Sequence, residues 1–138
     1  MILGYTTGVF DLFHIGHLNL LKNARALCDK LIVGVTTDEL LLEYKNKKPV
    51  IPFEERCEIV RNIKCVDAVI SQTTMNKYDA WKKLKFDVMF VGDDWYNTEK
   101  WQKIERQFQD AGVRIVYFPY TQGTSSTLIN QILLEKRG

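Results

Sequence analysis

The sequence has few of the features that mark secreted, membrane or zinc-binding proteins. Its three cysteines are odd in number and lack C-x-x-C spacing, which predicts buried free thiols rather than disulfides or a zinc site. No apolar run approaches the length of a transmembrane helix. The first residues, MILGYTTG, do not form the basic and then apolar stretch of a signal peptide. We therefore expect a soluble cytoplasmic protein that does not contact a membrane.

An excess of one charge is missing too. Lys and Arg number 19 against 17 Asp and Glu, a net charge of +2, so there is no general attraction for nucleic acid and any anion site must be a local cluster. Repeats, linkers and low-complexity tracts are also absent from the sequence. With 46% hydrophobic residues, a chain of 138 residues can build a sizeable core. We expect one domain that spans residues 1–138.

Strand-like and helix-like segments alternate along the chain. The apolar patterns predict strands at residues 2–6, 30–36, 66–71, 87–91 and 113–118. Helical spacing and capping residues predict helices at 16–27, 53–63, 76–84 and 99–111, and one after Thr124. This alternation indicates an α/β fold, a Rossmann-like, doubly wound and mostly parallel five-stranded sheet with helices on both faces. A ligand should bind at the carboxyl ends of the strands.

Both histidines of the chain lie in GVFDLFHIGH, residues 8–17, between the first predicted strand and the first predicted helix. A helix start offers free backbone N–H groups and a favourable dipole to a phosphate, and Gly16 lets a ligand approach the backbone. His14 and His17, three residues apart, can face that ligand together. They could then donate hydrogen bonds to a phosphoryl group in a transition state. The alternative is one capping and one packed histidine.

H14-I15-G16-H17 resembles the signature of the nucleotidyltransferase superfamily. Over nearly its full length the chain resembles a narrower family, the glycerol-3-phosphate cytidylyltransferases. The matching segments are GVFDLFHIGH (8–17), TTDE (36–39), KNKK (45–48), EER (54–56), VDAVI (66–70), GDDW (92–95) and TQGTSST (121–127).

The resemblance implies an enzyme that transfers a cytidylyl group from CTP to a small phosphate monoester, with glycerol 3-phosphate as the first candidate. The products are CDP-glycerol and pyrophosphate, Mg²⁺ accompanies the triphosphate, and the family forms homodimers. His14 and His17 are then catalytic, with Lys45, and the protein needs no metal ligands of its own. Residues implied in nucleotide binding are Val9, Phe10, Asp11, Gly16, Asp94, Tyr120, Thr121, Gly123, Thr124, Ser125, Ser126 and Thr127.

The resemblance implies that positively charged side chains bind the phosphate group of the acceptor. Lys45 and Lys47 are expected in a loop after the second strand, where the alternative is a solvated basic loop. Arg56 matches an arginine that contacts substrate phosphate, and the alternative is a surface ion pair with a neighbouring glutamate, at position 54, 55 or 58. Lys77 lies near a further substrate-binding lysine of the family.

The chain departs from the family at two arginines. Tyr120 and Lys64 stand where arginines are usual, and neither reproduces the guanidinium fork. Nothing in the residues selects cytosine over adenine. Three alternatives therefore stay open. They are a cytidylyltransferase for phosphocholine, phosphoethanolamine or another alditol phosphate, an adenylyltransferase of the same superfamily, and a non-catalytic nucleotide-binding module.

Overall fold

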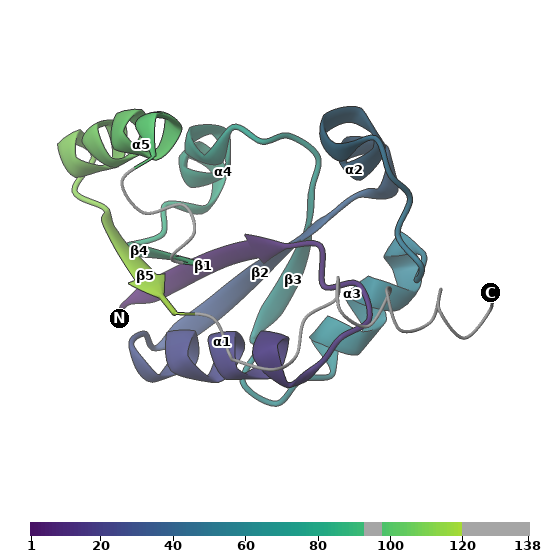
Figure 1. The fold of residues 1–138 in the computed structure, drawn as a ribbon. Coiled ribbons are helices and arrows are strands. Elements are labelled where there is room, and N and C mark those ends of the chain that lie inside the picture. The colour runs from purple at the N-terminus through teal and green to yellow at the C-terminus, as the bar shows by residue number, and fades with distance from the viewer. Residues whose placement is uncertain (93–97, 120–138) are drawn as a thin grey trace.

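The computed structural model describes residues 1–92 and 98–119, and Figure 1 shows a sheet with helices on both faces. All strand pairs are parallel, in the order β3-β2-β1-β4-β5. The strands are β1 (Leu3–Gly8), β2 (Lys30–Thr36), β3 (Ala68–Gln72), β4 (Val88–Gly92) and β5 (Arg114–Phe118). This confirms the Rossmann-like, doubly wound fold. Because the chain turns back across β1 to form β4, the strand order reverses between β1 and β4, where such sheets bind ligands.

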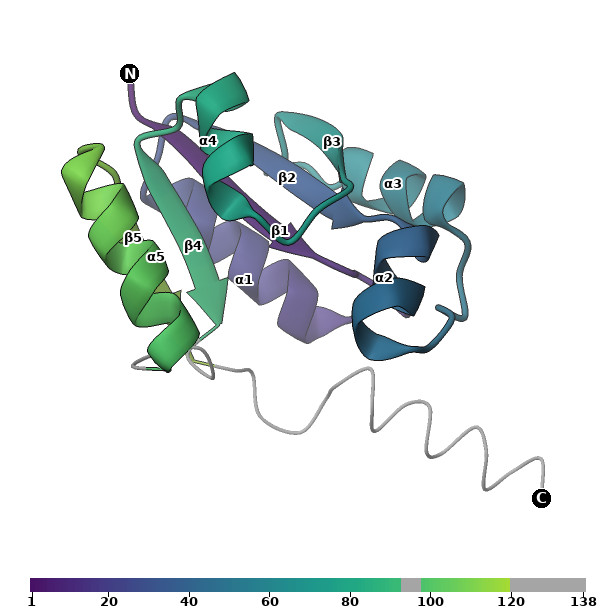
Figure 2. The same cartoon turned by 90° about the horizontal axis from the view of Figure 1, so that it is seen from above.

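The helices are distributed over the two faces of the sheet. They are α1 (Ile15–Ala26), α2 (Asp38–Lys45), α3 (Phe53–Arg61), α4 (Lys77–Leu84) and α5 (Glu99–Asp110). In Figure 1, α1 and α3 lie below the sheet, and α4 and α5 lie above it. Figure 2 shows α2 beyond the carboxyl end of β1, and in Figure 1 it lies on the opposite side of the sheet from α1. None of the helices in the described ranges is long and apolar enough to cross a membrane.

Each face of the sheet has its own apolar core. Leu31, Val33 and Val35 of β2 pack with residues of α1 and α3 on one face. On the other face, Met89 and Val91 of β4 pack with the aromatic residues of α5. A strand that is covered on both faces reads as a continuous apolar run, which is why β2 was predicted with its observed bounds.

One glycine makes room for a large core residue. A Cβ atom on Gly34 would lie 2.5 Å from the hydroxyl oxygen of Tyr5, which is fully buried and stacks on Phe86. All three cysteines are free, as predicted, and Cys28 and Cys57 are buried as expected, whereas Cys65 is half-buried.

The sequence missed helix α2. Thr37 caps it by accepting a hydrogen bond from the backbone N–H of Leu40, and Leu40 and Leu41 are buried. The prediction that Lys45 lies in a loop is therefore wrong, because Lys45 is the last residue of this helix. The first strand was also expected to end before Gly8, which the structure includes in β1. The helix predicted after Thr124 lies outside the described residues.

Candidate active site

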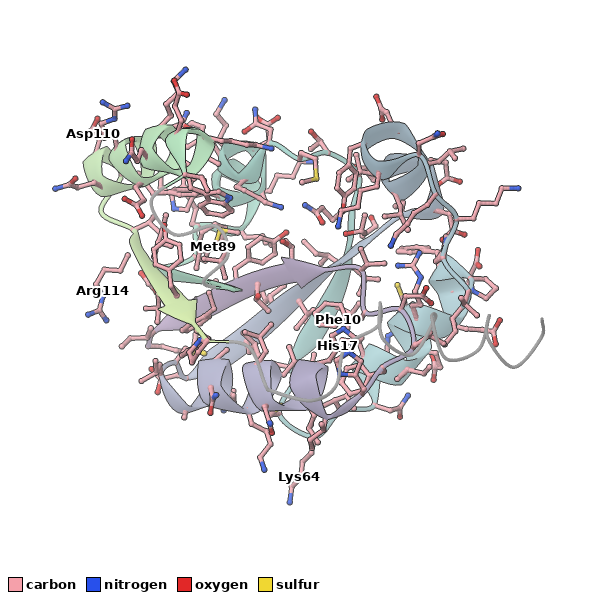
Figure 3. All side chains as sticks on the ribbon, viewed as in Figure 1. Phe10, His17, Lys64, Met89, Asp110 and Arg114 are labelled. Atoms are coloured by element: carbon pink, nitrogen blue, oxygen red, sulfur yellow. The ribbon has the colours of Figure 1, made fainter. Side chains whose placement is uncertain are left out.

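The loop between β1 and α1 has an unusual backbone. Phe10 and Leu12 adopt φ angles of 55° and 52°, a left-handed conformation that bulky side chains rarely take and that clusters at functional sites. The buried ring of Phe10 meets the imidazole of His17 edge-on at 5.4 Å between centroids, and Phe13 lies 5.3 Å from the same imidazole. Figure 3 shows Phe10 and His17 side by side near the start of α1. The strained loop thus fixes the position of His17.

The two histidines form a reciprocal cap at the start of α1. The Nδ1 atom of His14 accepts a hydrogen bond from the backbone N–H of Gly16 at 3.0 Å. The Nδ1 atom of His17 accepts one from the backbone N–H of His14 at 3.2 Å, and the two rings stack with centroids 4.0 Å apart. Because both Nδ1 atoms are acceptors, each neutral imidazole carries its proton on Nε2. The site therefore offers two Nε2–H donors on stacked rings.

Burial keeps these imidazoles neutral. Desolvation lowers the pKa of His14 below its usual value. It lowers the pKa of His17 to about 4, with a further decrease from the nearby charge of His14, while Asp11 acts in the opposite direction. At neutral pH the two rings can therefore lie together without repulsion and still donate hydrogen bonds. The capping role and a role toward a ligand are compatible, since they use different ring nitrogens.

The same contacts correct one expectation. Free backbone N–H groups were expected at this helix start, but those of His14 and Gly16 are both bonded to imidazole nitrogens. An anion at this end of α1 would therefore meet the Nε2–H groups in place of these two backbone donors. The close approach of a ligand to the backbone at Gly16 stays a prediction.

Arg56 is a buried clamp. Its side chain is fully buried, and Nε donates to the carbonyl oxygen of Ile51 at 2.9 Å. One Nη atom donates to the carbonyl oxygens of Val9, at 2.8 Å, and Thr36, at 2.7 Å, and the other pairs with the carboxylate of Asp38. The alternative of a surface ion pair with a glutamate of α3 is wrong. The contacts of Arg56 hold the surrounding loops together, and its contact with substrate phosphate stays a prediction.

Asp11 connects the loop between β1 and α1 to the segment that follows the lysines at positions 45–48. Its carboxylate accepts hydrogen bonds from the backbone N–H groups of Val50, at 2.8 Å, and Ile51, at 2.9 Å. Asp11 thereby helps to fix the shape of the loop between β1 and α1, and its contact with a nucleotide stays a prediction. Lys45 and Lys47 are exposed near the segment that Asp11 and Arg56 hold, and the Nζ atom of Lys45 lies 5.6 Å from the ring centroid of Tyr44.

Lys77 begins α4 and is buried at the edge of the sheet where the strands have their carboxyl ends. Its ammonium group donates to the hydroxyl of Thr7, near the end of β1, at 3.1 Å. Burial, and to a lesser degree the charge of Lys100, lowers the pKa of Lys77 to about 8. The sequence did not indicate Thr7 or Lys100, because their proximity to Lys77 depends on how the strands and helices pack. Asp38, the partner of Arg56, belongs to the matching segment TTDE, but the sequence alone did not assign it a role.

The predicted nucleotide contacts from the end of β4 and from the carboxyl-terminal segment lie outside the described residues. These are Asp94, Tyr120, Thr121, Gly123, Thr124, Ser125, Ser126 and Thr127. Val9 and Phe10 lie in the strained loop, where the carbonyl of Val9 is bonded to Arg56 and the ring of Phe10 is buried. Within the described ranges, no three His, Cys, Asp or Glu side chains form a group that could hold a metal ion.

Comparisons with known proteins agree on one family. Residues 5–132 match the sequence model of the family described as cytidylyltransferase-like. The chain is 38% identical over 127 residues to the glycerol-3-phosphate cytidylyltransferase of Bacillus spizizenii, covering 91% of this chain and 92% of that protein. It is 33% identical over 128 residues to the FAD synthase of Thermococcus kodakarensis, covering 91% and 85%. A crystal structure of a lipopolysaccharide core biosynthesis protein from Thermoplasma volcanium superposes with a TM-score of 0.73 at 25% identity, covering 90% and 99%.

Proposed function

Because this chain belongs to the cytidylyltransferase-like family and is a nucleotidyltransferase, we propose that it transfers the cytidylyl group of CTP to glycerol 3-phosphate. A phosphate oxygen of the acceptor forms a bond to the α-phosphorus of CTP. The bond from that phosphorus to the β-phosphate oxygen breaks, and pyrophosphate leaves with its electron pair. The products are CDP-glycerol and pyrophosphate, without a covalent enzyme intermediate.

The observation that carries this proposal is the pair of imidazoles at the start of α1. Their Nδ1 atoms are occupied by backbone N–H groups, so two Nε2–H donors are fixed in place before a substrate arrives. Negative charge builds on the non-bridging oxygens of the α-phosphoryl group as the attacking oxygen approaches. Preorganised donors stabilise that charge with little reorganisation, and removing one such donor typically costs a factor of about 10² to 10³ in kcat.

Lysines supply the positive charge that the acceptor requires. A phosphate monoester carries about −1.5 to −2 charges at neutral pH, so it approaches a triphosphate only if cations offset the repulsion. The proposal assigns this role to Lys45, Lys47 and Lys77, of which Lys77 is buried beside the end of β1. Arg56 is assigned to holding the loops together, in accordance with its buried contacts.

Mg²⁺ enters this proposal as a complex with the triphosphate. This ion keeps several of its waters and is often bound through substrate phosphates rather than by a dedicated protein cage. Its contribution is to neutralise charge on the leaving pyrophosphate. We also propose that the protein acts in the cytoplasm as a homodimer, which light scattering of the purified protein would test.

A second candidate is adenylyl transfer, because the FAD synthase of Thermococcus kodakarensis matches the same share of the chain, 91%, at 33% rather than 38% identity. Tyr120, which stands in place of a family arginine, also weakens the resemblance to the cytidylyltransferases. Both candidates use the same paired imidazoles, so the nucleotide must be determined by assay.

The test is pyrophosphate release from each of the four nucleoside triphosphates with Mg²⁺. The acceptors are glycerol 3-phosphate, ribitol 5-phosphate, phosphocholine, phosphoethanolamine and FMN. We expect the fastest release with CTP and glycerol 3-phosphate. Equal or faster turnover with ATP would overturn the assignment to CTP. A protein that binds nucleotide but releases no pyrophosphate with any pair would indicate a non-catalytic binding module.

A further inference from the structure

A cleft of about 580 Å³ is lined by residues of α4 and α5 and of the segment before α4, and Figure 1 shows these two helices above the sheet. Its lining includes Lys77 and Tyr78 of α4 and Glu99, Lys100, Lys103 and Ile104 of α5. Lys77 connects the cleft to the candidate active site, because its ammonium group reaches Thr7 near the end of β1. The loop that carries the histidines leaves β1 one residue later, after Gly8. An acceptor with its phosphate at that edge could extend into the cleft.

The lining of this cleft is predominantly positive. Three ammonium groups line it and Glu99 is the one carboxylate among its lining residues, which leaves two positive charges in excess. Among the described residues, no salt bridge involves Lys77, Lys100 or Lys103. Lys100 and Lys103 lie on one face of α5, one turn apart, so their charges add at the same wall of the cleft.

The cleft also lacks a free aromatic face for a cation. Tyr78 is the one aromatic residue in its lining, and its ring stacks on Trp81 with centroids 5.3 Å apart. The Nζ atom of Lys82 lies 5.2 Å from the centroid of the same ring. Proteins recognise quaternary ammonium groups with several aromatic faces, whereas this ring already has a cation of its own.

We infer that this cleft receives the part of the acceptor beyond its phosphate, and that its lysines exclude acceptors with a positively charged alcohol portion. These lysines then lower the turnover of phosphoethanolamine and phosphocholine relative to glycerol 3-phosphate. This inference rests on the proposed transfer to glycerol 3-phosphate and names the residues that select the acceptor. It assigns Lys100 and Lys103 to specificity, by repulsion of the wrong acceptor rather than by attraction of the right one.

The test compares kcat/KM for glycerol 3-phosphate and phosphoethanolamine in the wild-type protein and in the double variant Lys100→Glu/Lys103→Glu. Acidic residues are favourable in the first turn of a helix, where Lys100 lies, and Lys103 is exposed in the second turn, so this variant should fold. We expect the wild type to prefer glycerol 3-phosphate, and the double variant to reduce that preference by about tenfold or more, since two like-charge contacts become attractive. Phosphocholine, whose ammonium group cannot donate hydrogen bonds, should show the same change.

The matched control is Lys22→Glu/Lys83→Glu, which makes the same change of net charge at exposed lysines that do not line the cleft. It should leave the preference unchanged. Affinities of the same acceptors, measured by calorimetry, test the inference without turnover. Equal wild-type affinity for glycerol 3-phosphate and phosphoethanolamine, or an unchanged preference in the Lys100→Glu/Lys103→Glu variant, would overturn it. Absence of pyrophosphate release with every acceptor would instead overturn the proposed function.

Discussion

Replacing His14 by asparagine should separate the two roles of this residue. The Nδ1 atom of His14 accepts the backbone N–H of Gly16 and so caps α1, whereas Nε2–H is the donor assigned to the α-phosphoryl group. The side-chain oxygen of asparagine can occupy the place of Nδ1, because asparagine is among the preferred N-cap residues. It has no atom at the position of Nε2. The variant His14→Asn therefore removes the donor and keeps the cap, whereas His14→Ala removes both.

The expected magnitudes differ for the two roles. Loss of an N-cap side chain costs about 1 kcal/mol of stability, which in a chain of this size lowers Tm by about 3 to 5 °C. Loss of one preorganised donor lowers kcat by a factor of about 10² to 10³, or roughly 2.7 to 4 kcal/mol in the barrier. We thus expect both variants to lose kcat by the same factor, and His14→Ala alone to lose stability.

The assay needs three measurements on each variant, namely Tm, the affinity for CTP and kcat with saturating glycerol 3-phosphate. CTP affinity should change little, since an interaction made in the transition state affects kcat and kcat/KM together. A His14→Asn protein with wild-type kcat would refute the catalytic role. A His14→Asn protein that melts as low as His14→Ala would refute the reasoning about the cap.

Three further predictions follow from the same geometry. Replacing Lys45 and Lys47 by alanine, singly and together, should raise the KM for the acceptor more than that for CTP; steady-state kinetics that stay unchanged would return these lysines to the solvated-surface interpretation. Replacing Arg56 by leucine should lower the free energy of unfolding by about 3 to 5 kcal/mol in urea, because it leaves the Asp38 carboxylate and three carbonyl groups without their buried partner; a loss of less than about 1 kcal/mol would contradict the clamp. Because the pKa of His17 is lower in the folded protein than its usual 6.5, the unfolded chain binds a proton first, so stability should fall as pH decreases from about 6.5 to about 4; a His17→Asn protein with the same pH dependence in urea titrations would show that His17 contributes none of it.

The sequence by itself determined the order of the elements, apart from α2, and the resemblance to a family of nucleotidyltransferases. The apolar runs of the strands and the helical spacing of α1, α3, α4 and α5 were sufficient, since burial on both faces of a parallel sheet leaves a local pattern. Helix α2 was missed because eight residues with two buried leucines carry little periodicity. The pairing of His14 with His17 was also readable, because residues three apart on one helix turn are neighbours in any such helix.

The tertiary structure alone decided which contacts hold these residues in place and which side chains line the cleft between α4 and α5. Arg56 reaches Asp38 and the carbonyls of Val9 and Thr36 across segments that are 18, 47 and 20 residues away in sequence. Lys77 reaches Thr7, 70 residues away, because β3 and β1 end at the same edge of the sheet. Local pattern records burial and capping, which act within a few residues of the chain. Hydrogen bonds of a buried charge and the summed charge of a cleft depend on which elements pack together, and that depends on the strand order.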